Sequence, residues 1–120
     1  MNILIADDSK ASRMFMKSVL KSLIEEELSF CFAEDGEQAV ALYQNEMADL
    51  VFLDLTMPKK NGMEALREII HHDASAKVVI VTADAQKVSH DKAMKLGALD
   101  YICKPITEEK IERKLHVWLA

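Results

Sequence analysis

Four consecutive apolar residues, Leu50–Leu53, are followed directly by an aspartate, Asp54. An uninterrupted apolar run of this length is typical of a strand buried on both faces, as in a parallel sheet covered by helices. Pro58 and Gly62 then stop the strand and turn the chain into a loop. Because open α/β sheets bind ligands at the carboxyl ends of their strands, Asp54 lies where a ligand site is expected.

The same unit, an apolar strand followed by a helical pattern, occurs five times along the chain. We expect strands at Asn2–Ala6, Leu28–Ala33, Leu50–Leu53, Lys77–Val81 and Leu99–Cys103. Four of the helices have a residue that favours the N-cap position, namely Ser9, Asp35, Asn61 and Thr107. The remaining helix, Ala85–Leu96, is only weakly amphipathic and ends before Gly97. Strands that alternate with helices predict an α/β fold, a doubly wound parallel sheet with right-handed crossovers and helices on both faces.

The composition indicates one globular domain. The 120 residues include only three glycines and two prolines, so no linker divides the chain, and we expect residues 1–120 to form a single domain. The net charge of −5 argues against direct nucleic-acid binding. No apolar run reaches the roughly 20 residues that cross a bilayer, so no membrane insertion is expected. Cys31 and Cys103 are too few and too far apart for a disulfide framework, so we predict reduced, mostly buried thiols and a cytoplasmic location.

Polar residues stand at the ends of four of the five expected strands. They are the pair Asp7-Asp8, Asp54, Thr82 and Lys104. In a parallel sheet these four ends meet at one edge, so the side chains are expected to lie close together. Three carboxylates at one place repel one another and need a nearby cation to stay ionised. Carboxylate oxygens without histidine or cysteine favour Mg²⁺.

Magnesium at such an edge indicates phosphoryl chemistry, since the ion bridges phosphate oxygens and offsets their charge. Lys104 adds a positive charge that can pair with a phosphoryl oxygen, and Thr82 adds a hydroxyl donor. Asp54 can act as the nucleophile and form an aspartyl phosphate.

Taken together, these motifs resemble the receiver domains of two-component response regulators, the CheY-like family. The resemblance covers Asn2–Ala120. It is carried by the Asp-Asp pair after the first strand, Asp-Leu-x-Met-Pro-x-x-x-Gly from Asp54 to Gly62, Thr82-Ala83 and Lys104-Pro105. It implies a flavodoxin-like (βα)5 fold with strand order 2-1-3-4-5. It also implies a receiver that has no output domain within this chain.

The resemblance further implies a phosphoacceptor and a metal site. Asp54 would accept a phosphoryl group from a sensor histidine kinase or a phosphotransfer protein. Asp8, Asp54 and the backbone carbonyl of Thr56 would ligate Mg²⁺, for which Mn²⁺ can substitute, and Asp7 would act through water. The chain would catalyse only transfer to Asp54 and hydrolysis from it, and so would be a signalling switch.

Around the phosphoryl group, the resemblance assigns binding roles to Lys104, Thr82 and Ala83. It implies a cis peptide bond before Pro105, which aims the lysine amine into the acidic cluster.

The resemblance also implies a route by which the signal leaves the site. Thr82 would move toward the phosphoryl group and the ring of Tyr101 would follow, while Thr56 and Asp84 would tune the phosphoryl lifetime. The change would reach the surface formed by the fourth helix, fifth strand and fifth helix, where a downstream protein partner is expected. The chain itself would be a monomer or a weak, phosphorylation-dependent dimer.

Other functions of the same fold fit the residues less well. A haloacid-dehalogenase-type phosphatase needs a second aspartate two positions after the nucleophile, where this chain has Thr56. A nucleotide-binding module needs a loop rich in Gly, Ser or Thr after the first strand, and the segment Asp7–Lys10 would repel phosphate. A degenerate receiver that acts only as a protein-interaction module stays as the alternative, although it usually lacks an acid, the lysine or the threonine.

Overall fold

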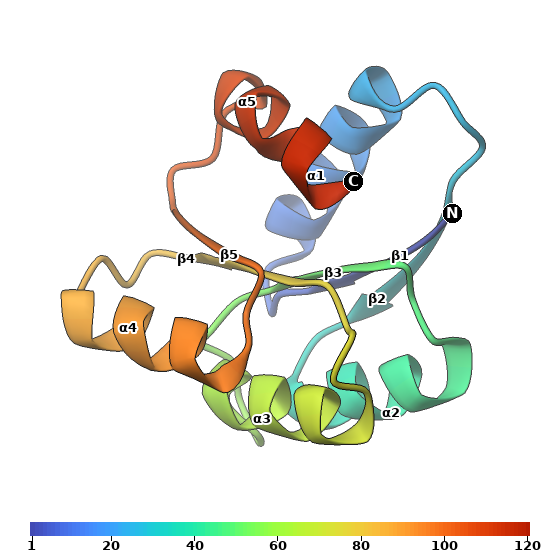
Figure 1. Cartoon of the computed structure of the whole chain (residues 1–120). Coiled ribbons are helices and arrows are strands. Elements are labelled where there is room, and N and C mark those ends of the chain that lie inside the picture. The colour runs from blue at the N-terminus through green and yellow to red at the C-terminus, as the bar shows by residue number, and fades with distance from the viewer.

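The computed structural model describes residues 1–120, in which five strands and five helices alternate (Figure 1). The strands are β1 (Asn2–Ala6), β2 (Ser29–Ala33), β3 (Leu50–Leu53), β4 (Val78–Thr82) and β5 (Asp100–Cys103). The helices are α1 (Lys10–Leu23), α2 (Gly36–Glu46), α3 (Gly62–His72), α4 (Lys87–Leu96) and α5 (Glu108–Trp118). All strand pairs are parallel and their order is β2-β1-β3-β4-β5. The predicted α/β class and strand order are therefore confirmed.

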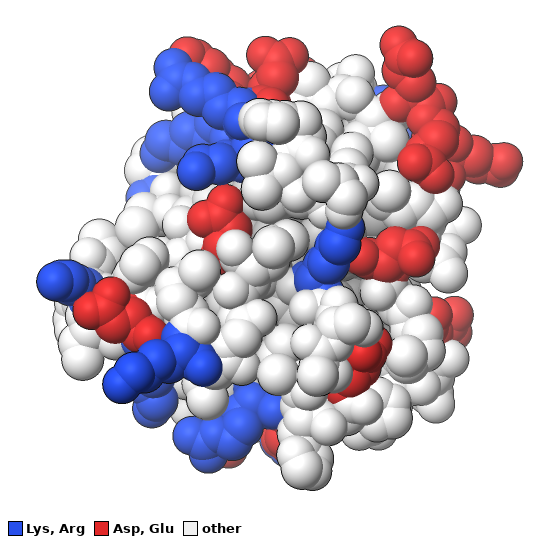
Figure 2. All heavy atoms as spheres, viewed as in Figure 1, with Lys and Arg blue, Asp and Glu red and all other residues white.

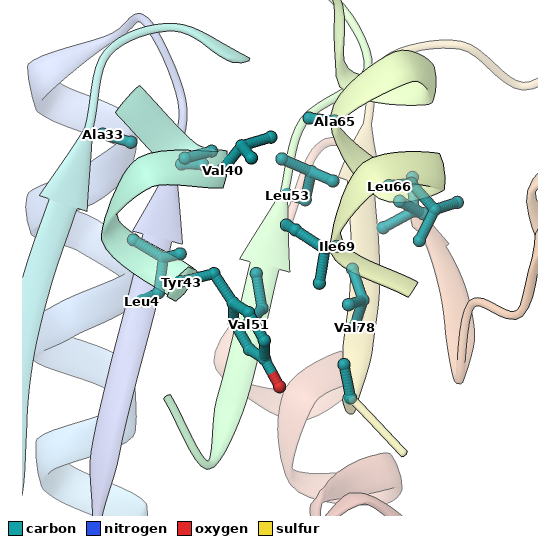
Figure 3. Packing of buried hydrophobic residues seen from close by; sticks show 14 of the residues in the cluster. Leu4, Ala33, Val40, Tyr43, Val51, Leu53, Ala65, Leu66, Ile69 and Val78 are labelled. Atoms are coloured by element: carbon teal, nitrogen blue, oxygen red, sulfur yellow. The ribbon is translucent and has the colours of Figure 1, made fainter. Parts of the chain in front are cut away.

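Helices cover both faces of the sheet, with α1 and α5 on one face and α2, α3 and α4 on the other (Figure 1). Successive strand residues point to opposite faces, so each strand contributes to two cores. Ile3 and Ile5 of β1 pack in the core under α1 and α5, together with the fully buried Trp118. Leu4 belongs to the opposite core, where Tyr43 of α2 packs over the sheet (Figure 3).

The four predicted helix caps are confirmed. The side chains of Ser9, Asp35, Asn61 and Thr107 each accept a hydrogen bond from the backbone N–H three residues later. Each of these bonds satisfies one of the N–H groups that a helix leaves unpaired in its first turn. Gly97 caps the C-terminus of α4 with a φ of 110°, a conformation that favours glycine.

Several predicted boundaries were wrong by one or two residues. β2 begins at Ser29 and β5 at Asp100, each one residue later than predicted. β4 runs one residue further along the chain, because Thr82 pairs in register with Cys103 of β5. The prediction that the fourth helix begins at Ala85 was also wrong, since α4 begins at Lys87.

The two cysteines fit the expectation of mostly buried thiols. Cys31 and Cys103 are both free, and each is partly buried. Cys31 lies on the edge strand β2, where burial and the charge of Glu46 raise the pKa of its thiol. None of the helices has the length and the apolar character that crossing a membrane requires.

Candidate functional site

Three aspartates meet at the carboxyl ends of the two central strands. Asp7 and Asp8 follow β1, and Asp54 follows the neighbouring strand β3. One carboxylate oxygen from each lies within 4.8 Å of the others. Asp7 and Asp54 are each only 6% exposed, whereas Asp8 faces solvent. The parallel register therefore brings together the acidic residues that the sequence placed at strand ends.

Lys104 places a positive charge within this cluster. Its Nζ lies 2.8 Å from an oxygen of Asp7 and 3.0 Å from an oxygen of Asp54. Burial alone would lower the pKa of the Lys104 amine, but the hydrogen bonds and charges of the two carboxylates outweigh burial and raise it. The Lys104–Pro105 peptide bond is cis, the isomer that the resemblance implied. The backbone N–H of Lys104 also donates to the carbonyl of Thr82, which ties the lysine to the end of β4.

The cluster has the chemistry of a site for a hard divalent cation. Its ligand atoms are carboxylate oxygens only, which is the donor set that Mg²⁺ prefers. The second oxygens of the two buried aspartates are fixed by the backbone: Asp7 accepts from the N–H of Ser9, and Asp54 from the N–H of Thr56. The carboxylates are thus held in place before any ligand arrives, and Asp8 adds a third oxygen donor on the solvent side.

The residues expected to form the switch lie on the β4 side of the cluster. Thr82 is fully buried, and its Oγ1 accepts a hydrogen bond from the N–H of Asp84. Ala83 between them is exposed. The Tyr101 hydroxyl donates to the carbonyl of Asp84, and the ring packs edge-on against His90 with centroids 5.2 Å apart. Burial raises the pKa of Tyr101 to about 12, so the ring hydroxyl stays a donor at neutral pH.

One residue beside the site, Arg13, was not predicted from the sequence. Arg13 of α1 is buried, and its Nη1 donates to the carbonyl of Asp7 at 2.8 Å. Its Nη2 also pairs with Glu34 at 3.6 Å, so the side chain links the loops that follow β1 and β2. The helical period could have predicted that Arg13 is buried. Arg13 stands three residues before the buried Met16 and so falls on the inner face of α1.

A hollow of about 300 Å³ opens beside the cluster, between α1 and the segment after β5. Its walls are mostly apolar and include Phe15 and Met16 of α1 together with Pro105 and Ile106. Asp54 and Lys104 lie in its lining. The acidic cluster is therefore approached from a partly apolar surface.

The model of the response regulator receiver domain matches residues 3–116. The chain belongs to this family. It is 42% identical over 111 residues to the Bacillus subtilis protein CcdB, covering 91% of this chain and 89% of that one. It is 37% identical over 110 residues to the chemotaxis protein CheY of Halobacterium salinarum, covering 91% and 88%.

A solved structure shows the same fold. The match is to the crystal structure of the CheX–CheY–BeF3–Mg²⁺ complex from Borrelia burgdorferi, with a TM-score of 0.93 and 30% identity. It covers all of this chain and 90% of the other. The chain is thus a CheY-like receiver domain of two-component systems, a class of signalling switches that interact with kinases and downstream partners. Receiver domains bind Mg²⁺ through an acidic cluster, which Asp7, Asp8 and Asp54 form here.

A metal-binding experiment tests the individual ligands. We expect Asp8→Ala to lower the affinity for Mg²⁺ by about tenfold or more, because a half-hydrated ion then loses one of few protein oxygens. Calorimetry with Mg²⁺ and paramagnetic broadening by Mn²⁺ measure the change. Asp91→Ala, which removes an exposed aspartate of α4, should leave the affinity unaltered. An Asp8→Ala protein that binds as tightly as the wild type would show that Asp8 is not a ligand.

Proposed function

We propose that Asp54 accepts a phosphoryl group from the phosphohistidine of a sensor kinase or phosphotransfer protein, and that the resulting charge switches the domain. The observation that carries this proposal is the Lys104 amine, which lies within 3.0 Å of both Asp7 and Asp54. A cation in this position serves an incoming phosphoryl group directly. A degenerate receiver would have no use for a half-buried lysine held between two buried aspartates.

The transfer step follows from these contacts. One oxygen of Asp54 attacks phosphorus, and the bond from phosphorus to the histidine nitrogen breaks. The imidazole keeps the electron pair and takes a proton from solvent. Lys104 then pairs with a phosphoryl oxygen, while the N–H of Thr56 keeps the aspartate in place. Such reactions depend mainly on positioning and charge stabilisation.

The remaining site residues take supporting roles in this proposal. Asp8, Asp54 and the carbonyl of Thr56 would hold Mg²⁺ or Mn²⁺, with Asp7 acting through water, and the ion would offset phosphoryl charge. Thr82 would donate its hydroxyl to a phosphoryl oxygen beside the backbone of Ala83. Hydrolysis from Asp54 would reset the switch.

The signal would leave through α4, β5 and α5. The Thr82 hydroxyl accepts a hydrogen bond from the N–H of Asp84, and the Tyr101 hydroxyl donates to the carbonyl of Asp84, so a shift of Thr82 would disturb the position of the ring. Side chains of Lys and Arg gather over α4 and α5 in Figure 2. By sequence, α4 carries Lys87, Lys92 and Lys95, and α5 carries Lys110, Arg113 and Lys114. A downstream protein would dock on this face.

Two further expectations stay predictions: that the chain is a monomer or a weak phosphorylation-dependent dimer, and that its location is cytoplasmic.

Intact-mass analysis tests the proposal. With Mg²⁺ and acetyl phosphate, the wild-type protein should gain one phosphoryl group, and Asp54→Asn should gain none, because the amide is not a nucleophile. Asp91→Asn, a change at an exposed aspartate of α4, should label as the wild type does. Equal labelling of the wild type and Asp54→Asn would overturn the assignment of Asp54. No labelling of any protein would favour the degenerate receiver.

A further inference from the structure

Asp84, after the end of β4, is a junction of five hydrogen bonds, one of them a long contact from the Cys103 thiol to its carbonyl. Its N–H donates to Thr82 Oγ1 at 3.3 Å, and its carbonyl accepts from the Tyr101 hydroxyl at 2.5 Å. Its carboxylate accepts from the N–H of Gln86 at 2.9 Å and from the hydroxyl of Ser89 at 2.6 Å. The backbone of Asp84 therefore contacts both expected switch residues, and its side chain contacts the start of α4.

This junction replaces the usual cap of α4. The other four helices begin with a side chain that accepts a bond from their own first turn. Gln86, at the N-cap position of α4, makes no such bond. The start of α4 is instead bonded to a residue that precedes the helix. The Asp84 carboxylate accepts hydrogen bonds from the N–H of Gln86 and the hydroxyl of Ser89. These two bonds connect the start of α4 directly to Asp84.

The carboxylate has room for another orientation. A hollow between the β3–α3 loop and α4 is lined by Thr56, Asp84, Ser89 and Lys92. Ser89 holds the Asp84 carboxylate on the α4 side of this hollow. Without that hydroxyl, the carboxylate keeps only its bond to Gln86 and is free to turn into the hollow, toward Thr56 or Lys92.

We propose that Ser89 is a positioning residue that fixes Asp84 to α4, so that a movement of Thr82 is passed through Asp84 to the helix. The proposal rests on the proposed role of Thr82 as the residue that responds to the phosphoryl group. It adds a specific contact, since no hydrogen bond or ion pair joins Ser89 or another residue of α4 directly to the acidic cluster. Through the hydrogen bond between Ser89 and Asp84, a movement of Thr82 would reach α4.

A titration in the resting protein tests the contact alone. Hydrogen bonds from Ser89 and Gln86 lower the pKa of the Asp84 carboxyl, because they stabilise its charged form. In Ser89→Ala we expect this pKa, followed by carboxyl ¹³C NMR, to rise toward the ordinary aspartate value. Ser89→Thr keeps a hydroxyl and should keep the low pKa. Ser18→Ala, at an exposed serine of α1, should change nothing. An unaltered titration in Ser89→Ala would overturn the proposal.

A second measurement tests the coupling. We expect beryllofluoride with Mg²⁺ to shift the amide signals of Asp54, Thr82 and the first turn of α4 in the wild type and in Ser89→Thr. In Ser89→Ala the shifts at Asp54 and Thr82 should persist while those of Lys87–His90 are lost. A full α4 response in Ser89→Ala would overturn the proposal. If Asp54 responds in no variant, the proposed function fails, and the resting titration still decides whether Ser89 positions Asp84.

Discussion

Replacing Lys104 by methionine should slow the labelling of Asp54 by acetyl phosphate by about 10²-fold or more, the usual effect of removing one preorganised charge-stabilising donor. The Lys104 amine lies 3.0 Å from Asp54, which is where phosphoryl charge would develop in the proposed reaction. Methionine keeps an unbranched apolar stem and removes the ammonium group with its hydrogen bonds to Asp7 and Asp54. The measurement is the rate of phosphorylation followed by intact mass at fixed Mg²⁺ and acetyl phosphate concentrations.

Metal affinity should move in the opposite direction in the same variant. Lys104 and a divalent cation share the carboxylates of Asp7 and Asp54, so removing the amine relieves repulsion between two cations and we expect tighter Mg²⁺ binding. A slower reaction with tighter metal binding separates loss of the lysine from general damage to the site. Lys114→Met, at an exposed position of α5, should change neither quantity. Labelling at the wild-type rate in Lys104→Met would contradict the proposed role.

The ion pairs of Lys104 with Asp7 and Asp54 make the stability of the fold depend on pH. Because the pKa of Lys104 is higher in the folded protein than in the unfolded chain, its ion pairs stabilise the fold below the unfolded lysine pKa of about 10.4. That stabilisation is lost as the pH rises through the higher folded value. Lys104→Met should therefore have a lower free energy of unfolding than the wild type at neutral pH. As the pH rises to strongly alkaline values, this free energy should fall less in Lys104→Met than in the wild type.

Much of the site followed from the sequence because a parallel sheet obeys simple geometry. Asp7, Asp54, Thr82 and Lys104 are far apart in the chain, but each stands at the end of an apolar strand, and parallel strands end at one edge. The spacing alone therefore predicted that the acids and the lysine meet. The strand order came from the family resemblance, since the alternation of strands and helices is compatible with more than one order.

Features that depend on side-chain partners in space did not follow from the sequence. The helical pattern from Ala85 onward placed the start of α4 two residues early. The Asp84 carboxylate accepts the N–H of Gln86, which makes a turn that delays the helix. The bond from the Tyr101 hydroxyl to Asp84 is likewise tertiary, and no local pattern encodes it. These misses cluster beside β4, where the expected switch residues lie.

Gly62 is more tightly constrained in the structure than its place in a loop motif predicted. The sequence predicted only that it helps to close a loop. In the structure it is the first residue of α3, and a Cβ there would lie 2.0 Å from the carbonyl oxygen of Asp54 and 2.5 Å from Cα of Leu55. Both atoms belong to the backbone of Asp54 and its neighbour Leu55, so no side-chain rotation relieves the clash.

We therefore expect Gly62→Ala to lower the free energy of unfolding by about 3 kcal/mol, the upper end of the usual cost of overpacking. The sign is the test, because Gly→Ala within a helix ordinarily stabilises by about 1 kcal/mol. Asn61→Ala is the matched control: it removes the cap bond to the N–H of Glu64 without a clash and should cost about 1 kcal/mol. Urea denaturation compares the three proteins. A Gly62→Ala protein at least as stable as the wild type would mean that α3 shifts easily away from Asp54. A large loss would show that the close approach of α3 to the backbone of Asp54 is tightly packed and cannot widen at low cost.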